Sequence, residues 1–140
     1  MSKYDDIRSA LEVALATIPG LPAIAWENRP YNPTTGTPYI QVRQVPTSRV
    51  PAVRGLNPQM RYQGIFRLFV KMPELQGPGP GEDIVESLLN TFEATTDLSF
   101  TNSNNETIHV TIDYAEQVGA YNESPWYTLP VNIGWYSYSL

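Results

Sequence analysis

The chain has 140 residues, of which 41% are hydrophobic, 11% aromatic and 16% charged, and its formal net charge is -5. This length predicts a single domain over residues 1–140 with a sizeable core, and the composition excludes a disordered chain and a coiled coil. Cysteine is absent and histidine occurs once, at His109, which excludes disulfide scaffolds, Cys-ligated zinc, iron–sulfur clusters, thiol catalysis and any site that needs two imidazoles.

The first half of the chain predicts one helix and three strands. In residues 3–18, apolar side chains recur three and four positions apart, which is the spacing of one helix face. Short apolar or alternating runs then predict strands at residues 22–27, 38–45 and 61–72, and the last of these has the strongest pattern.

The second half of the chain predicts a second helix and two or three more strands. The helix covers residues 82–94 and carries acidic residues in its first turn, where the helix macrodipole favours them. Strands follow at residues 107–114 and 126–138, with a short extra one at 98–101. The order α-β-β-β-α-β-β predicts an α+β fold, a mainly antiparallel sheet of four to five strands with two helices packed on one face.

The apolar sides of these elements define the predicted core. Each core candidate lies on the apolar side of its own element's period. We expect one buried cluster formed by Phe66, Leu68, Leu88, Phe92, Val110 and Val131.

Thirteen prolines and nine glycines gather in three stretches, at residues 27–38, 45–58 and 73–82. Because proline fixes φ and lacks a backbone donor, each stretch predicts a loop rather than a helix interior or a central strand. The second predicts a long Pro/Arg-rich loop at about residues 46–60. Few large apolar side chains anchor it, so we expect it to be mobile in the isolated subunit and ordered against a neighbour.

Charge is distributed unevenly along the chain. Residues 28–73 hold seven Arg or Lys and no acid, whereas residues 74–140 hold ten acids and no Arg or Lys. The two segments either neutralise each other within one fold or meet between neighbouring copies, because opposite charges across an interface steer association. Arginines suit bidentate contacts and outward tyrosines suit interfaces, so the predicted interface residues are Arg43, Arg49, Arg54, Arg61, Tyr136 and Tyr138.

No pattern in the sequence predicts a catalytic, cofactor or metal site. The GPGPG run before the second helix lacks the Lys-Ser/Thr of a phosphate loop, and its prolines remove donors. Acidic residues at the start of that helix form no calcium loop and are explained as a solvated first turn. His109 and Asp113 lie four apart on one strand, but no nucleophile signature accompanies them. The net negative charge argues against a dedicated nucleic-acid binder.

The sequence also predicts where the protein works. No apolar run approaches the roughly 20 residues of a membrane span, and the N-terminal MSKYDDIRSALE does not have the pattern of a signal peptide. We expect a soluble protein in the cytoplasm, or in something assembled there.

In order and length of its elements, nearly the whole chain resembles the small tail terminator (tail completion, minor tail protein U-like) proteins of long-tailed bacteriophages. The resemblance rests on the opening helix DDIRSALEVALATIPG, the strand and long loop PYIQVRQVPTSRVPAVRGLNP, the strand YQGIFRLFVKMPE, the helix EDIVESLLNTF, and paired C-terminal strands with an aromatic-rich end. The Pro/Arg content of residues 46–60 departs from the family, so no role is carried over for that loop.

The resemblance implies a structural virion protein without enzymatic activity or cofactor. It implies a homohexameric ring in the neck of the virion, built in the host cytoplasm, which caps the tail tube, ends its polymerisation and provides the head-tail joining surface. The implied partners are further copies of the chain, the tail tube protein, a head-completion or connector protein, and DNA that passes through the ring without sequence-specific binding; no membrane is implied.

Three alternatives remain open from the residues. Another neck component, such as a head-completion or connector adaptor protein, would share the size and the ring. A small monomeric binding module would need a pocket, for which Trp26, Tyr39 and Tyr62 are the candidates. A hydrolase would need His109 and Asp113 together in a cleft.

Overall fold

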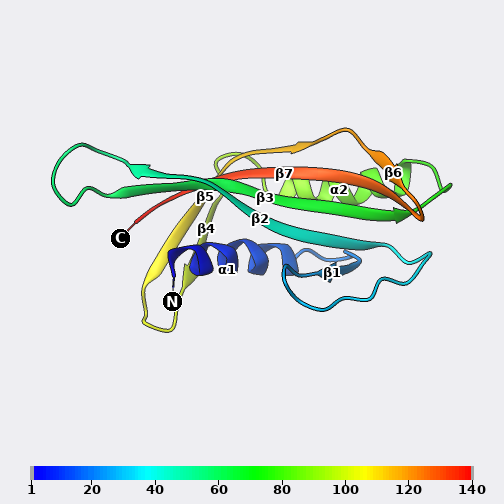
Figure 1. The fold of residues 1–140 in the computed structure, drawn as a ribbon, viewed down its shortest axis with the longest axis horizontal. Helices are drawn as coiled ribbons and strands as arrows, with labels where there is room; N and C mark the ends of the chain where they lie inside the picture. The colour runs from blue at the N-terminus through cyan, green and yellow to red at the C-terminus, as the bar shows by residue number, and fades with distance from the viewer. Residues whose placement is uncertain (1, 140) are drawn as a thin grey trace.

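A computed structural model describes residues 2–139, which form two helices and one seven-stranded sheet (Figure 1). The elements are α1 (Lys3–Ala16), β1 (Ala23–Ala25), β2 (Tyr39–Pro51), β3 (Met60–Pro73), α2 (Gly79–Thr91), β4 (Asp97–Thr101), β5 (Thr107–Gln117), β6 (Tyr121–Glu123) and β7 (Trp126–Tyr138). The α+β class agrees with the sequence prediction. Neither helix is long and apolar enough to span a membrane.

The sheet has more strands than the sequence predicts, and it is mixed. Its spatial order is β1-β2-β3-β7-β5-β4, with β6 paired to β7. β1 runs parallel to β2, whereas the other pairings are antiparallel. The prediction of four to five strands is therefore too low. β1 and β4 lie where strands are predicted at residues 22–27 and 98–101, whereas β6 is not predicted, because its three residues are too few to show a periodicity.

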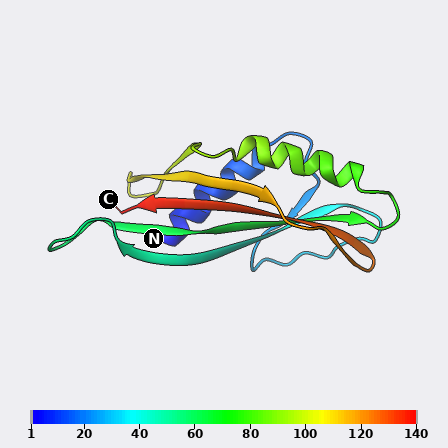
Figure 2. The same cartoon turned by 90° about the horizontal axis from the view of Figure 1, so that it is seen from above.

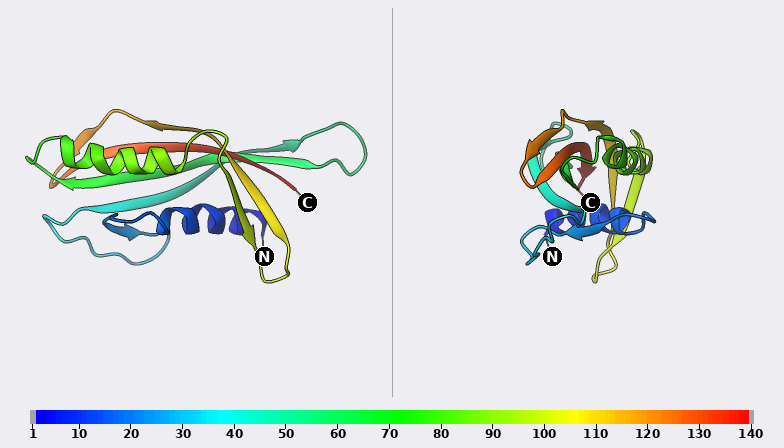
Figure 3. Two further views of the ribbon diagram at one scale, coloured as in Figure 1. Left: turned by 180° about the vertical axis from the view of Figure 1, so that it is seen from behind. Right: turned by 90° about the vertical axis from the view of Figure 1, so that its right-hand side faces the viewer.

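Both helices lie on one face of the sheet, and the core lies between them and the strands (Figure 2). The end view shows that the sheet is curled, with α1 below it (Figure 3). Ser2 caps α1 by accepting a hydrogen bond from the backbone N–H of Asp5. All six predicted core residues belong to one cluster and have no exposed side-chain surface, which confirms that prediction: Phe66, Leu68, Leu88, Phe92, Val110 and Val131.

The strand register separates the core face from an opposite face that neither helix covers. In an antiparallel sheet, paired residues point to the same side. Arg43 pairs with Arg67, which pairs with Asn132, and these three side chains lie opposite the core. We call this side of β2, β3 and β7 the open face.

The β2–β3 hairpin projects beyond the rest of the sheet (Figure 1), and we call its outer part, residues 46–65, the arm. The predicted loop at residues 46–60 is shorter in the structure, because residues 46–51 continue β2 and only residues 52–59 form the turn. β1 pairs only with residues 39–41 of β2, so this stretch of β2 has one unpaired edge. Proline is tolerated at such an edge and at a bulge, and the register shift of β2 lies between Pro46 and Ser48.

Candidate interaction surface

One predicted interface cluster assembles near the outer end of the arm, on the open face. β3 and β7 bring Arg61 opposite Tyr138. The guanidinium of Arg61 lies 4.7 Å from the ring centroid of Tyr136, whose ring is 5.9 Å from that of Tyr138. Such cation–π contacts hold the side chains in place, and Tyr138 keeps 43% of its surface exposed. The structure thus brings together three of the six predicted interface residues.

Arg43 lies further along the open face, beside Arg67. The Nε–H of Arg67 donates to Asn132 Oδ1 at 3.2 Å, and its guanidinium lies 5.5 Å from the ring centroid of Phe69. Within residues 2–139, neither arginine makes an ion pair with a carboxylate. The middle of the open face therefore carries two arginines without an ion pair, in a row that continues through Asn132 to its partner Glu116 on β5.

The other two predicted arginines lie away from the open face. Arg49 pairs with Tyr62 across the hairpin, on the helix side of the sheet. Its Nε–H donates to the Tyr62 hydroxyl at 2.9 Å, and its guanidinium lies 5.3 Å from the ring centroid of Tyr62. Arg54 lies in the turn at the tip of the arm. The six predicted residues thus divide among the open face, the helix side and the tip.

The tip of the arm carries exposed apolar side chains, which the sequence alone does not mark as an interaction surface. Val50 is 46% exposed, Val53 61% and Leu56 98%. The turn at residues 52–59 contains Gly55 at φ 134° and Asn57 at φ 50°, conformations that glycine and asparagine adopt most readily. The only sign of this surface in the sequence is that Val53 and Leu56 lie within a stretch otherwise typical of a polar turn.

The opposite end of the molecule carries a shallow apolar depression that we call the end notch. It lies where the turn after β3 meets β6 and β7, at the end of the molecule away from the arm (Figure 1). Its volume is about 230 Å³, and it is lined by Pro73, Leu75, Gly77, Pro78, Asn122 and Tyr127. Leu75 is fully exposed and has φ 67°. The sequence marked this segment only as a Gly/Pro turn.

Acidic side chains occur in the segments that form the end notch and at the start of α2, which follows it. They lie in the turn after β3, in the first residues of α2 and in β6, and they are Glu74, Glu82, Asp83 and Glu123. The cation nearest to them in sequence, Lys71, is buried. Its ammonium donates to Thr128 Oγ1 at 3.1 Å and lies 3.7 Å from Glu123 Oε1. This end of the molecule is therefore acidic on its surface.

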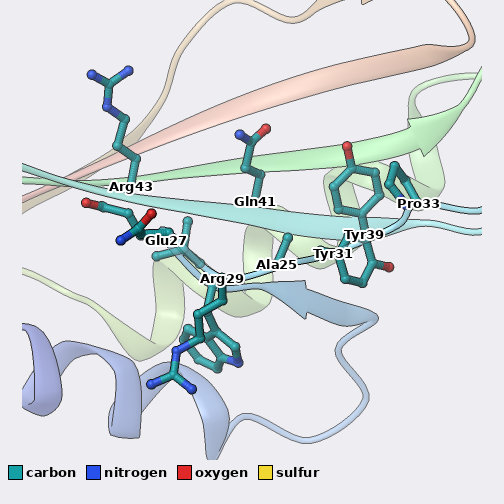
Figure 4. A pocket seen from close by; sticks show the side chains of 11 residues that line it. Ala25, Glu27, Arg29, Tyr31, Pro33, Tyr39, Gln41 and Arg43 are labelled. Carbon is teal, nitrogen blue, oxygen red and sulfur yellow. The ribbon is translucent and has the colours of Figure 1, made fainter.

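A larger pocket lies at the edge of β2 beside β1, with a volume of about 450 Å³ (Figure 4). Trp26, Tyr31 and Tyr39 line it together with Glu27, Arg29 and Arg43. Two of the three aromatic residues named for a binding module are thus present. The third, Tyr62, does not line the pocket, because its ring packs on that of Tyr4 at 5.2 Å on the core side.

The residues named for hydrolysis do not form a pair. His109 Nδ1 lies 3.3 Å from Asp97 Oδ2 on the exposed β4–β5 hairpin. Asp113, at the bulge of β5, lines a different depression together with Arg61 and Tyr136. In the part of the chain that the structure describes, no three His, Asp or Glu side chains gather as a metal site would require.

Comparison with known proteins adds a family and a fold. A family model described as phage tail terminator protein matches residues 6–135. A solved structure of another protein superposes with a TM-score of 0.71 and 20% sequence identity, covering 100% of this chain and 98% of that one. At this identity the superposition supports the fold alone. No curated protein matches the chain.

Proposed function

The chain belongs to the phage tail terminator family, and from this premise we propose that it forms a closed ring that caps the tail tube. The family gives the protein a structural, non-enzymatic role in the phage tail. We further propose that the ring has six copies, ends polymerisation of the tail tube and provides the surface to which a head-completion or connector protein binds. The partners are then other copies of the chain, the tail tube protein and the protein of the head side.

The observation that supports a ring is the separation of charge on the surface. The arm and the open face carry Arg43, Arg54, Arg61 and Arg67, whereas the segments at the other end, around the end notch, carry acidic residues. A head-to-tail ring needs two different patches that complement each other, and opposite charges orient the approach of two subunits. Because exposed ion pairs contribute only about 0–1 kcal/mol each, the contact must also bury apolar surface, for which Tyr138 is exposed.

The same separation bears on how DNA passes through the ring. A strongly positive wall would hold the phosphate backbone, whereas a neutral or acidic wall would let it slide. If the arginines lie between subunits, acidic surface remains for the opening of the ring. We therefore propose an acidic or neutral lumen and no sequence-specific contact with DNA.

Electron microscopy and sedimentation of the purified protein test the ring. We expect closed rings at low salt and fewer of them at high salt, because surface charges are screened over about 8 Å at physiological ionic strength. Arg54→Glu should weaken assembly without unfolding the subunit. Arg49→Glu is less suitable, because it also removes the hydrogen bond to Tyr62. Arg29→Glu, an exposed site outside the arm, makes the same change in charge and serves as the control.

Addition of the protein to polymerising tail tube protein tests the cap. We expect shorter tubes with a ring at one end. A protein that stays monomeric at every concentration would exclude the ring, and tubes of unchanged length would exclude the cap. Binding to a connector but not to the tube would favour another neck component instead.

A further inference from the structure

We propose that the tip of the arm of one copy docks into the end notch of the next copy. This contact rests on the proposed ring and names the surfaces that would close it. The tip and the notch lie at opposite ends of the molecule (Figure 1), so the contact is head-to-tail. Repetition of such a contact gives a ring when the rotation closes.

Packing within the subunit does not explain why aliphatic side chains are exposed at the tip of the arm. β7 pairs with β3 as far as Arg61, so beyond the end of β7 the arm consists of the last β2–β3 pair, Pro51 with Met60, and the turn. The three aliphatic side chains Val50, Val53 and Leu56 point into solvent, and Leu56 is 98% exposed. A single exposed aliphatic residue is ordinary, but several gathered at the end of a projection mark a contact surface.

The end notch has the size and lining to receive aliphatic side chains. Its volume of about 230 Å³ is below the roughly 300–1,000 Å³ of a typical small-molecule site. Pro73, Pro78 and Tyr127 are among the six residues that line it. At its rim Leu75 is fully exposed and adopts φ 67°, a conformation that is uncommon for a leucine. The conformation holds an apolar side chain outside the subunit core.

Charge complements the apolar match. The arm carries Arg49, Arg54 and Arg61 and has no acidic residue. The segments that form the notch and the start of α2 carry Glu74, Glu82, Asp83 and Glu123, of which, within residues 2–139, only Glu123 is close to a cation, Lys71. The ammonium of Lys71 is already paired with Thr128 and Glu123 inside the subunit. A basic tip is therefore attracted by the notch, while two tips or two notches repel each other.

The arm is not built for pairing edge to edge with a neighbouring sheet. Beyond β1, the unpaired edge of β2 contains two prolines, Pro46 and Pro51, which cannot donate a ladder hydrogen bond. The N–H of Gln44 is occupied by the side chain of Glu27. Prolines on an edge strand prevent the addition of a further strand. This leaves the tip as the part of the arm that makes the contact.

Disulfide trapping tests the contact directly, because the chain has no native cysteine. Leu56→Cys is mixed with Leu75→Cys, assembled and oxidised, and the product is read on a non-reducing gel. Val13→Cys, an exposed position on α1 (55%), replaces Leu75→Cys in the control mixture. We expect at least tenfold more dimer from the first mixture, and a ladder of covalent oligomers from the double variant.

A second variant measures the contact without oxidation. Leu56→Asp should reduce ring formation at least tenfold relative to Val13→Asp, with the same circular dichroism spectrum as the parent. Two outcomes would overturn the arm-to-notch contact and leave the ring intact. In the first, rings form but the two trapping mixtures give equal yields of dimer. In the second, Leu56→Asp forms rings as abundant as those of the parent. A parent that never assembles would overturn the ring and, with it, this contact.

Discussion

Replacing Gly64 with alanine should destabilise the subunit strongly, because three strands meet at this residue without room for a side chain. Gly64 of β3 pairs with Pro46 of β2 and with Trp135 of β7. An added Cβ would lie 2.6 Å from the carbonyl oxygen of Val45 and 2.7 Å from Cζ2 of Trp135. The first neighbour is backbone and the second is a ring that is 1% exposed, so neither can move away at little cost.

The size of the effect follows from these contacts. Overpacking of a core costs about 1–3 kcal/mol. Movement of Trp135 also strains the 3.2 Å hydrogen bond from its Nε1–H to Gln44 Oε1, and such a bond contributes about 0.5–1.5 kcal/mol. We therefore expect Gly64→Ala to lower the free energy of unfolding by about 2–4 kcal/mol. For a domain of this size the midpoint temperature then falls by roughly 4–16 °C, at about 2–4 °C per kcal/mol.

Urea unfolding followed by tryptophan fluorescence measures this loss. Gly119→Ala is the matched control, because a Cβ at Gly119 has no neighbour within 4 Å. Its free energy of unfolding should stay within about 0.5 kcal/mol of the parent, as for other surface changes. A Gly64→Ala variant that is equally unaffected would refute the close approach of β2, β3 and β7 at this point.

Three further predictions concern the core, the pH dependence and the arm. Leu88→Ala removes a fully buried side chain and should cost about 2–5 kcal/mol in urea unfolding, whereas Glu86→Ala on the exposed side of α2 should cost little. Partial burial raises the pKa of Glu12, and Asp5 and Glu27 add to this against the attraction of Arg8 and Arg29. The folded state therefore binds the carboxyl proton of Glu12 more tightly than the unfolded state does. Ionisation of Glu12 then destabilises the fold, and this loss begins only as the pH rises above the pKa of Glu12 in the unfolded chain, about 4.3. Glu12→Gln should therefore stabilise the protein at pH 7 and lose this advantage below pH of about 4. Trypsin should cleave the isolated subunit after Arg54 in the turn and much more slowly after Arg49 in β2, and assembly should slow the cut after Arg54.

Each of these predictions has an outcome that contradicts it. A loss below about 0.5 kcal/mol for Leu88→Ala, the level of a surface change, would show that this face of α2 does not lie in the core. An equal gain for Glu12→Gln at pH 3.5 and pH 7 would show that its carboxylate is not the destabilising form. Equal cleavage after Arg54 in subunits and in assembled tails would remove the idea that the tip becomes covered.

Local sequence patterns determined the helices, the long strands and the core. The alternation in residues 126–138 gave the bounds of β7 as the structure has them. The same period placed Phe66, Leu68, Val110 and Val131 inside, because one side of a strand faces the core at every second residue. Helix periodicity likewise identified Leu88 as buried. These features depend on neighbours along the chain, which the sequence displays directly.

The positions of the surface residues could be determined only from the tertiary structure. Arg43 and Arg49 are six residues apart, and an even spacing on a regular strand predicts one common face. The bulge between Pro46 and Ser48 adds a residue to β2, so Arg49 turns to the helix side while Arg43 stays on the open face. The prolines of the arm predicted a loop. Pro46 and Pro51 nevertheless lie within β2, because β1 does not extend along this edge and leaves it unpaired. A bulge and a free edge depend on which strands pair and where, and pairing between distant segments leaves no local period in the sequence.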